Sequence, residues 1–174
     1  GTNGTGEAYI FTRSGTTWSQ QAKLTASDAA DGDLFGAGVD ISDDGDTVVI
    51  GAYGEDTGGN ATGSAYVFTR SGTTWTQQQK IQSSDIEAGD NFGIAVGISG
   101  NSENIIVGAQ AEDTGGSNAG SAYVFTLSGS TWSQQAKIQA SSSASDELFG
   151  LSVDISTDGN TVAIGASLND GNGS

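Results

Sequence analysis

Carboxylates that recur at one fixed spacing are the residues of this sequence with the clearest potential for chemistry. Two adjacent acidic pairs stand 57 residues apart, and two single aspartates have the same separation. The candidate metal ligands are Glu55, Asp56, Glu112, Asp113, Asp33 and Asp90. Carboxylate oxygens are the ligands that Ca²⁺ prefers in proteins. The chain has no His and no Cys, so it lacks the usual zinc ligands and the usual general base.

Aromatic residues follow the same spacing and allow a second kind of chemistry. The sets are Trp18, Trp75 and Trp132, and Phe35, Phe92 and Phe149. A tryptophan among small polar residues can stack on a sugar ring, which would make the chain a glycan-binding protein. The other role is packing between neighbouring units, because each repeated unit needs a large apolar side chain. We expect the tryptophans to be structural and the phenylalanines to lie in the core.

The shared spacing identifies a tandem repeat that fills nearly the whole chain. Three copies of a 57-residue unit follow one another without an insertion. The same spacing joins Tyr9, Tyr66 and Tyr123, and also Gly51, Gly108 and Gly165. A period of this length indicates a solenoid or a propeller.

Each unit contains four segments with the pattern of short β-strands. In the middle of the chain, residues 92–99 alternate between apolar and small side chains, and residues 104–109 form a nearly continuous apolar run. Residues 121–126 are aromatic and β-branched, and residues 132–139 alternate again. The connections are rich in Gly, Ser, Asn and Asp. The pattern predicts an all-β protein, and four strands per unit describe a propeller blade.

The unit resembles the FG-GAP repeat of integrin-α-type β-propellers, particularly its bacterial variant. The matching motifs in the first copies are Phe35-Gly36, Gly51-Ala52, GSAYVFTRSGTTW at 63–75 and QQAKL at 20–24. Their equivalents are Phe92-Gly93, Gly108-Ala109, Phe149-Gly150 and Gly165-Ala166. The family often has proline after Gly-Ala, whereas Tyr53, Gln110 and Ser167 stand there in this chain.

The resemblance implies where the blades begin and end, because the Phe-Gly strand is innermost and the Trp-led strand outermost in such propellers. Residues 1–174 then form one repeat domain, in which 35–83 and 92–140 are complete blades of four antiparallel strands. Residues 7–26 supply an outer half-blade and residues 149–166 the complementary inner half-blade. Each half-blade leaves a row of unpaired backbone groups.

Three completions of the split blade are open at the level of sequence. Copies of the chain can complete one another in a closed homo-oligomer, in which two copies make a six-bladed ring. Strand-swapped copies can instead form an open filament. The chain begins with Gly rather than Met, so it can also be a mature product or a segment of a longer array of repeats.

The resemblance also bears on the acidic loops. Integrin-type propellers commonly bind Ca²⁺ between the first two strands of a blade, but residues 43–46 are too short to wrap a cation and suit a tight hairpin turn. The loops after Gly-Ala and before Phe-Gly emerge on one face of a propeller and carry 13 of the 21 acidic residues. Either calcium or solvent screens this charge.

Composition excludes several classes of function. With 5 basic and 21 acidic residues the net charge is −16, which repels nucleic acid and anionic lipid. No apolar run of this sequence is long enough to insert into a membrane, and we expect no signal peptide within it. The repeated carboxylates lack the asymmetry of an active site, so we do not expect an enzyme.

We expect a non-catalytic extracellular or cell-surface module for adhesion or structural assembly, as the resemblance implies. Repeated faces suit many weak contacts in place of one strong contact. The alternative is a calcium-dependent, lectin-like propeller. Its partner would be a cell-surface protein or a glycan, and Ca²⁺ is the one cofactor to consider.

Overall fold

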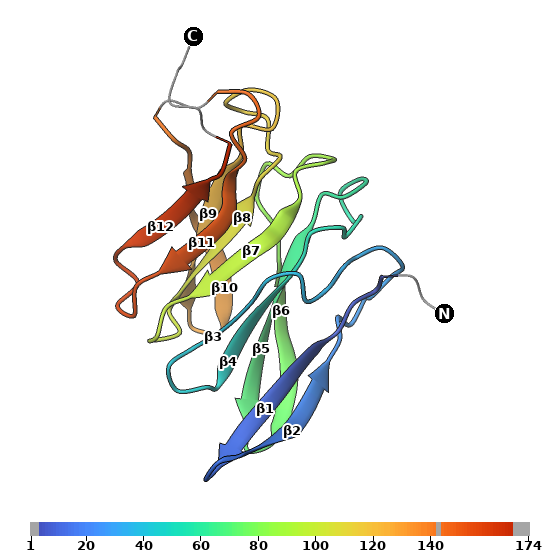
Figure 1. Ribbon diagram of the computed structural model, residues 1–174, viewed down its shortest axis with the longest axis vertical. Coiled ribbons are helices and arrows are strands. Elements are labelled where there is room, and N and C mark those ends of the chain that lie inside the picture. The colour runs from blue at the N-terminus through green and yellow to red at the C-terminus, as the bar shows by residue number, and fades with distance from the viewer. Residues whose placement is uncertain (1–3, 142–143, 169–174) are drawn as a thin grey trace.

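The computed structural model describes residues 4–141 and 144–168, and the regular structure in these residues consists entirely of β-strands (Figure 1). The first six strands are β1 (Ala8–Ser14), β2 (Thr17–Leu24), β3 (Val39–Ile41), β4 (Thr47–Ala52), β5 (Ser64–Ser71) and β6 (Thr74–Ile81). The last six are β7 (Phe92–Ile98), β8 (Asn104–Ala109), β9 (Ser121–Ser128), β10 (Thr131–Ile138), β11 (Phe149–Ile155) and β12 (Val162–Ala166). The all-β expectation is confirmed.

The strands form four separate antiparallel sheets. Two sheets have four strands each, in the orders β3-β4-β5-β6 and β7-β8-β9-β10. The other two are the pairs β1-β2 and β11-β12. The four-stranded sheets are propeller blades, and the sheets follow one another along the molecule from β1-β2 at one end to β11-β12 at the other (Figure 1).

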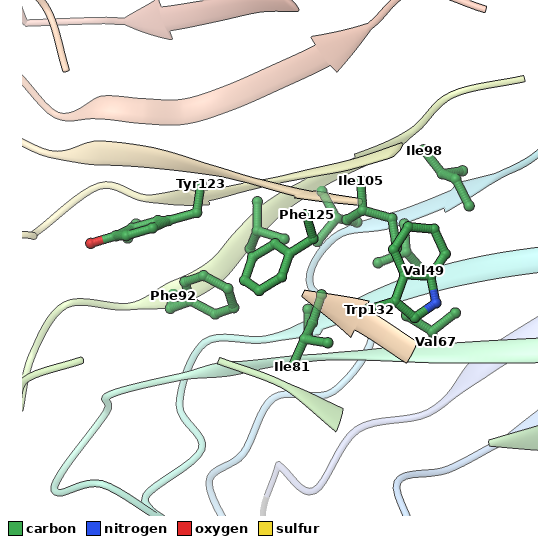
Figure 2. Close-up of a cluster of buried hydrophobic side chains, with 13 residues drawn as sticks. Val49, Val67, Ile81, Phe92, Ile98, Ile105, Tyr123, Phe125 and Trp132 are labelled. Carbon is green, nitrogen blue, oxygen red and sulfur yellow. The ribbon is translucent and has the colours of Figure 1, made fainter. Parts of the chain in front are cut away.

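The hydrophobic core lies between successive sheets rather than within one sheet. The cluster between the two complete blades joins Val49, Val67 and Ile81 of one blade to residues of the next, among them Phe92 and Phe125 (Figure 2). Similar clusters join β1-β2 to the first blade and the second blade to β11-β12. Strands β4 and β8 are covered on both faces, which explains their continuous apolar runs.

The Gly-Ala and Phe-Gly motifs meet where two sheets stack. A Cβ atom added to Gly51 would lie 1.9 Å from the backbone oxygen of Gly93, and one added to Gly108 would lie 1.9 Å from that of Gly150. No real Cβ atom tolerates such a distance, so the close approach of the sheets requires glycine at both positions. The paired motifs therefore set how each blade packs on the next.

Candidate functional site

The acidic loops at one edge of the blades are organised around a lysine from an outer strand. Lys80 on β6 places its Nζ atom 2.7 Å from Asp28 Oδ2 and 2.9 Å from Glu55 Oε1. The same ammonium group donates to Thr57 Oγ1 at 2.9 Å. The next blade repeats the arrangement, because Lys137 on β10 lies 2.6 Å from Asp85 Oδ2 and 2.9 Å from Glu112 Oε1. These contacts place two positive charges among the acidic loops, in addition to the calcium or solvent that the sequence analysis considered.

The buried glutamate of each network has several further partners. Glu55 accepts hydrogen bonds from Ser64 Oγ at 2.8 Å, from the Thr57 backbone N–H at 2.9 Å and from the Thr57 hydroxyl. Gln82 Nε2 adds a longer contact of 3.3 Å. Burial raises the pKa of Glu55, but the hydrogen bonds from Thr57, Lys80 and Ser64 outweigh burial and hold that pKa below its ordinary value. Glu55 is therefore ionised and held in place at neutral pH.

The lysines respond in the opposite direction. Burial by itself lowers the pKa of Lys80, whereas the bonds to Asp28 and Glu55 raise it, and the net result is a raised pKa. Lys137 behaves in the same way beside Asp85 and Glu112. Both lysines are thus charged at neutral pH.

The other predicted ligands cap turns of the backbone. Asp56 accepts a hydrogen bond from the Ala61 N–H at 2.7 Å, and Asp113 accepts one from the Asn118 N–H, also at 2.7 Å. Asp33 and Asp90 are buried, and they accept the Ala30 N–H at 2.7 Å and the Glu87 N–H at 2.8 Å, respectively. Each carboxylate thus serves the local turn that carries it.

The donor set does not fit Ca²⁺ as it is arranged. Within residues 4–141 and 144–168, no three acidic side chains lie close enough together to share a metal ion. Between Asp28 and Glu55, the position that a cation would need is taken by the ammonium group of Lys80. Calcium binding by Glu55, Asp56, Glu112, Asp113, Asp33 and Asp90 stays a prediction for titration.

Sequence reasoning missed the two lysines and two of their aspartates as members of this site. Asp28 and Asp85 stand 57 residues apart, and so do Lys80 and Lys137. That spacing was the available signal. The spacing does not show that a lysine on an outer strand reaches the aspartate in the segment before its own blade.

The predicted structural aromatics differ in exposure along the chain. Phe35 and Phe92 are buried between sheets, and Trp132 lies in the cluster between the complete blades. Trp75 is partly buried and donates its indole N–H to Gln21 Oε1 at 2.9 Å. Trp18 is 63% exposed, because no preceding sheet covers it within the described residues. Phe149 is half-buried, because the β11-β12 pair lacks the third strand whose aromatic rings pack on Phe35 and Phe92 in the complete blades.

The edge of β1 exposes two aromatic side chains. Tyr9 is 48% exposed and Phe11 is 51% exposed. Their repeat equivalents in the complete blades are fully or almost fully buried, with Tyr66 at 0% and Phe68 at 4%. The difference arises because β5 pairs with β4 and its blade packs on the β1-β2 sheet, whereas β1 pairs only with β2 and no preceding sheet covers it within the described residues.

Two grooves accompany these open ends. One, of about 440 Å³, lies between β1 and the inner strands of the first blade and is lined by Tyr9, Phe11, Val39 and Ile41 among others. The second, of about 350 Å³, lies on the β11-β12 pair and includes Ile164 and Gly165. A groove with exposed apolar walls beside an unpaired strand is suited to receive another strand.

Comparison with known proteins identifies the repeat. No curated protein matches the chain. A crystal structure of Saccharomyces cerevisiae Sqt1 is similar, with a TM-score of 0.49 and 12% sequence identity, and the match covers 84% of this chain and 32% of that one. The chain thus spans about a third of that structure. The family model described as the FG-GAP repeat matches residues 18–68, 75–125 and 132–174. With three matches over most of its length, the chain belongs to the FG-GAP repeat family.

Proposed function

We propose that this chain is a non-catalytic propeller module for adhesion or structural assembly outside the cell. Its split blade is completed by strands from outside the chain, which come from other copies or from further repeats. The observation that carries the proposal is the bare edge of β1, where Tyr9 and Phe11 are about half exposed although their equivalents are buried. An unpaired strand with apolar walls favours assembly over an isolated state.

The polar networks support a structural role rather than catalysis. Glu55 and Glu112 are each neutralised by a lysine and saturated with hydrogen bonds, so neither is poised to exchange a proton near pH 7. The networks are also near-copies of one another, whereas an active site needs unlike groups. None of the described residues belongs to a helix that could span a membrane.

Family membership and charge favour a place outside the cell. Integrin-type propellers, which this repeat resembles, act at the cell surface. A net charge of −16 and the lack of cysteine are compatible with a protein that works outside the cell. Successive blades repeat the same face, so weak contacts with a surface protein or glycan would add up through avidity.

One pair of measurements tests the proposal. Light scattering with negative-stain microscopy gives the mass and shape of the particle, and a glycan array with and without EDTA tests sugar binding. We expect defined assemblies and no glycan signal. A monomer whose β1 amides are protected from hydrogen exchange would overturn the proposal. Chelator-sensitive glycan binding would favour the lectin-like alternative instead.

A further inference from the structure

We infer that the strands that complete the β1 edge are β11 and β12 of a second copy of this chain, and that two copies close a six-bladed ring. The inference rests on the proposed function, which requires completion from outside but leaves its source open. Within one chain the two half-blades cannot meet, because β1 and β12 lie at opposite ends of the molecule (Figure 1).

The repeat fixes the register of the new strand pair. In the complete blades Val48 pairs with Phe68, and Ile105 pairs with Phe125. Val162 holds the repeat position of Val48 and Ile105, and Phe11 holds that of Phe68 and Phe125. Val162 of the second copy therefore lies opposite Phe11 in the completed blade. In the same way, Ile50 pairs with Tyr66 in the first blade, so Ile164 of the second copy should pair with Tyr9. Both exposed aromatics would then gain the neighbours that bury their equivalents.

The backbone groups of the two edges also match. In the first blade the Arg70 N–H donates to Asp46 O at 2.8 Å, which makes these opposite residues a hydrogen-bonded pair. Alternation along an antiparallel ladder then directs the backbone groups of Tyr9 and Phe11 toward the open edge of β1. Val162 and Ile164 present theirs on the open edge of β12 by the same rule. Pairing therefore satisfies both rows together.

The same pair of strands fills the neighbouring groove. Val39 and Ile41 are exposed on the first blade, whereas their equivalents Val96 and Ile98 are buried against the preceding blade. Gly165 corresponds to Gly51 and Gly108, which accept the backbone of the next Phe-Gly motif at close range. In the ring Gly165 would accept the Phe35-Gly36 segment of the second copy. The β11-β12 pair of the second copy would thus pair with the edge of β1 and at the same time pack on the exposed face of the first blade.

Counting blades selects two copies. Each copy contributes two complete blades and the two halves of a third, so a pair has four complete and two completed blades. Six blades lie within the range of about four to eight that closed propellers use. Three copies would exceed that range, and a two-fold pair is the commonest closed assembly.

Cysteine pairing on the cysteine-free chain tests the register. Val49 and Val67 form a non-hydrogen-bonded pair, whose equivalents are Ala163 of the second copy and Ile10. The side chains of such a pair are close enough for a disulfide. The variant Ile10→Cys with Ala163→Cys should oxidise to a covalent dimer on a non-reducing gel. Ile10→Cys with Ile164→Cys is the matched control, because a shift of one residue turns the thiol to the opposite face.

Each outcome of the oxidation has a distinct meaning. A ladder of covalent oligomers would replace the ring by a filament and overturn the inference. Equal cross-linking in both variants, or none in a defined oligomer, would overturn the strand pairing and leave the proposed function standing. A monomer with protected β1 amides would overturn both.

Discussion

The Nζ atom of Lys80 lies 2.9 Å from Oε1 of Glu55, and both side chains are largely shielded from solvent. The pair joins the outermost strand of a blade to the loop that follows its second strand. Asp28, from the segment before the blade, completes the contact. Each network therefore brings three distant parts of the sequence together, and Glu55, a predicted calcium ligand, forms an internal ion pair in the described chain.

Removal of the ammonium group tests the weight of this contact. Lys80→Met should lower the free energy of unfolding by about 2 kcal/mol, because it leaves Glu55 charged and without its lysine in a buried place. Urea denaturation measures the change. Lys23→Met is the matched control, since the Lys23–Glu7 pair is exposed, and its effect should be clearly smaller. Equal effects would show that the network stabilises nothing beyond an ordinary surface pair.

Calcium titration tests whether Ca²⁺ can take the place of the Lys80 ammonium group between Asp28 and Glu55. With Lys80 replaced by Met, Asp28 and Glu55 are two carboxylates without a counter-charge, so added CaCl₂ should raise the melting temperature of the variant more than that of the unaltered chain. Scanning calorimetry with and without EDTA gives both values. A strong calcium response of the unaltered chain that is lost in Asp56→Ala or Asp113→Ala would instead establish the site predicted from the sequence.

The buried Asp90 gives stability a measurable pH dependence. Burial raises the pKa of Asp90 to about 6 from an ordinary value of 3.8, and the nearby Glu112 acts in the same direction. The folded state therefore holds its proton when the unfolded state has lost it, so stability falls as pH rises between about 4 and 6. Asp90→Asn should flatten this fall in urea denaturation at pH 4, 5, 6 and 7. An unchanged pH profile would contradict the assignment to Asp90.

Two glycines at equivalent positions should respond differently to the same change. Gly108→Ala forces a Cβ atom against the backbone oxygen of Gly150 and should destabilise the fold by about 3 kcal/mol. Among the residues that the structure describes, Gly165→Ala meets only the Ser152 hydroxyl at close range, and that side chain can rotate away. The second variant should therefore retain monomer stability in denaturation but lose assembly in light scattering. Loss of stability in both would indicate that Gly165 is already packed in the single chain.

Salt should strengthen assembly. Asp40 accepts the Ile98 N–H of the next blade at 2.8 Å, and Asp154 holds the same repeat position as Asp40. In the closed ring Asp154 of the second copy would approach Asp40 itself, so two carboxylates would repel until ions screen them. Sedimentation at about 20 mM NaCl, where charges are weakly screened, and at about 500 mM NaCl, where they are strongly screened, should show tighter dimers at the higher concentration. Asp154→Asn should reduce this dependence, and a dimer that weakens with salt would contradict it.

The strands and their order were readable from the sequence because they depend on local alternation and on one repeated period. Residues 104–109 form an apolar run, and β8 is indeed covered on both faces. The Phe-Gly and Gly-Ala motifs lie on successive strands in β7-β8 and β11-β12, whereas in the first blade Phe35-Gly36 precedes the short strand β3. Strand pattern and strand order depend on the local sequence, which is nearly the same in each copy of the repeat.

The partners of individual side chains were decided by the tertiary structure. Trp18 and Trp132 are the same residue in the repeat, yet one is 63% exposed and the other 3%, because only the second has a preceding blade to pack against. Lys80 reaches Glu55 from a strand that is distant in sequence, and the spacing of the acidic residues did not predict this ion pair. A period specifies which residues are equivalent, whereas packing in three dimensions determines which of them have a neighbour.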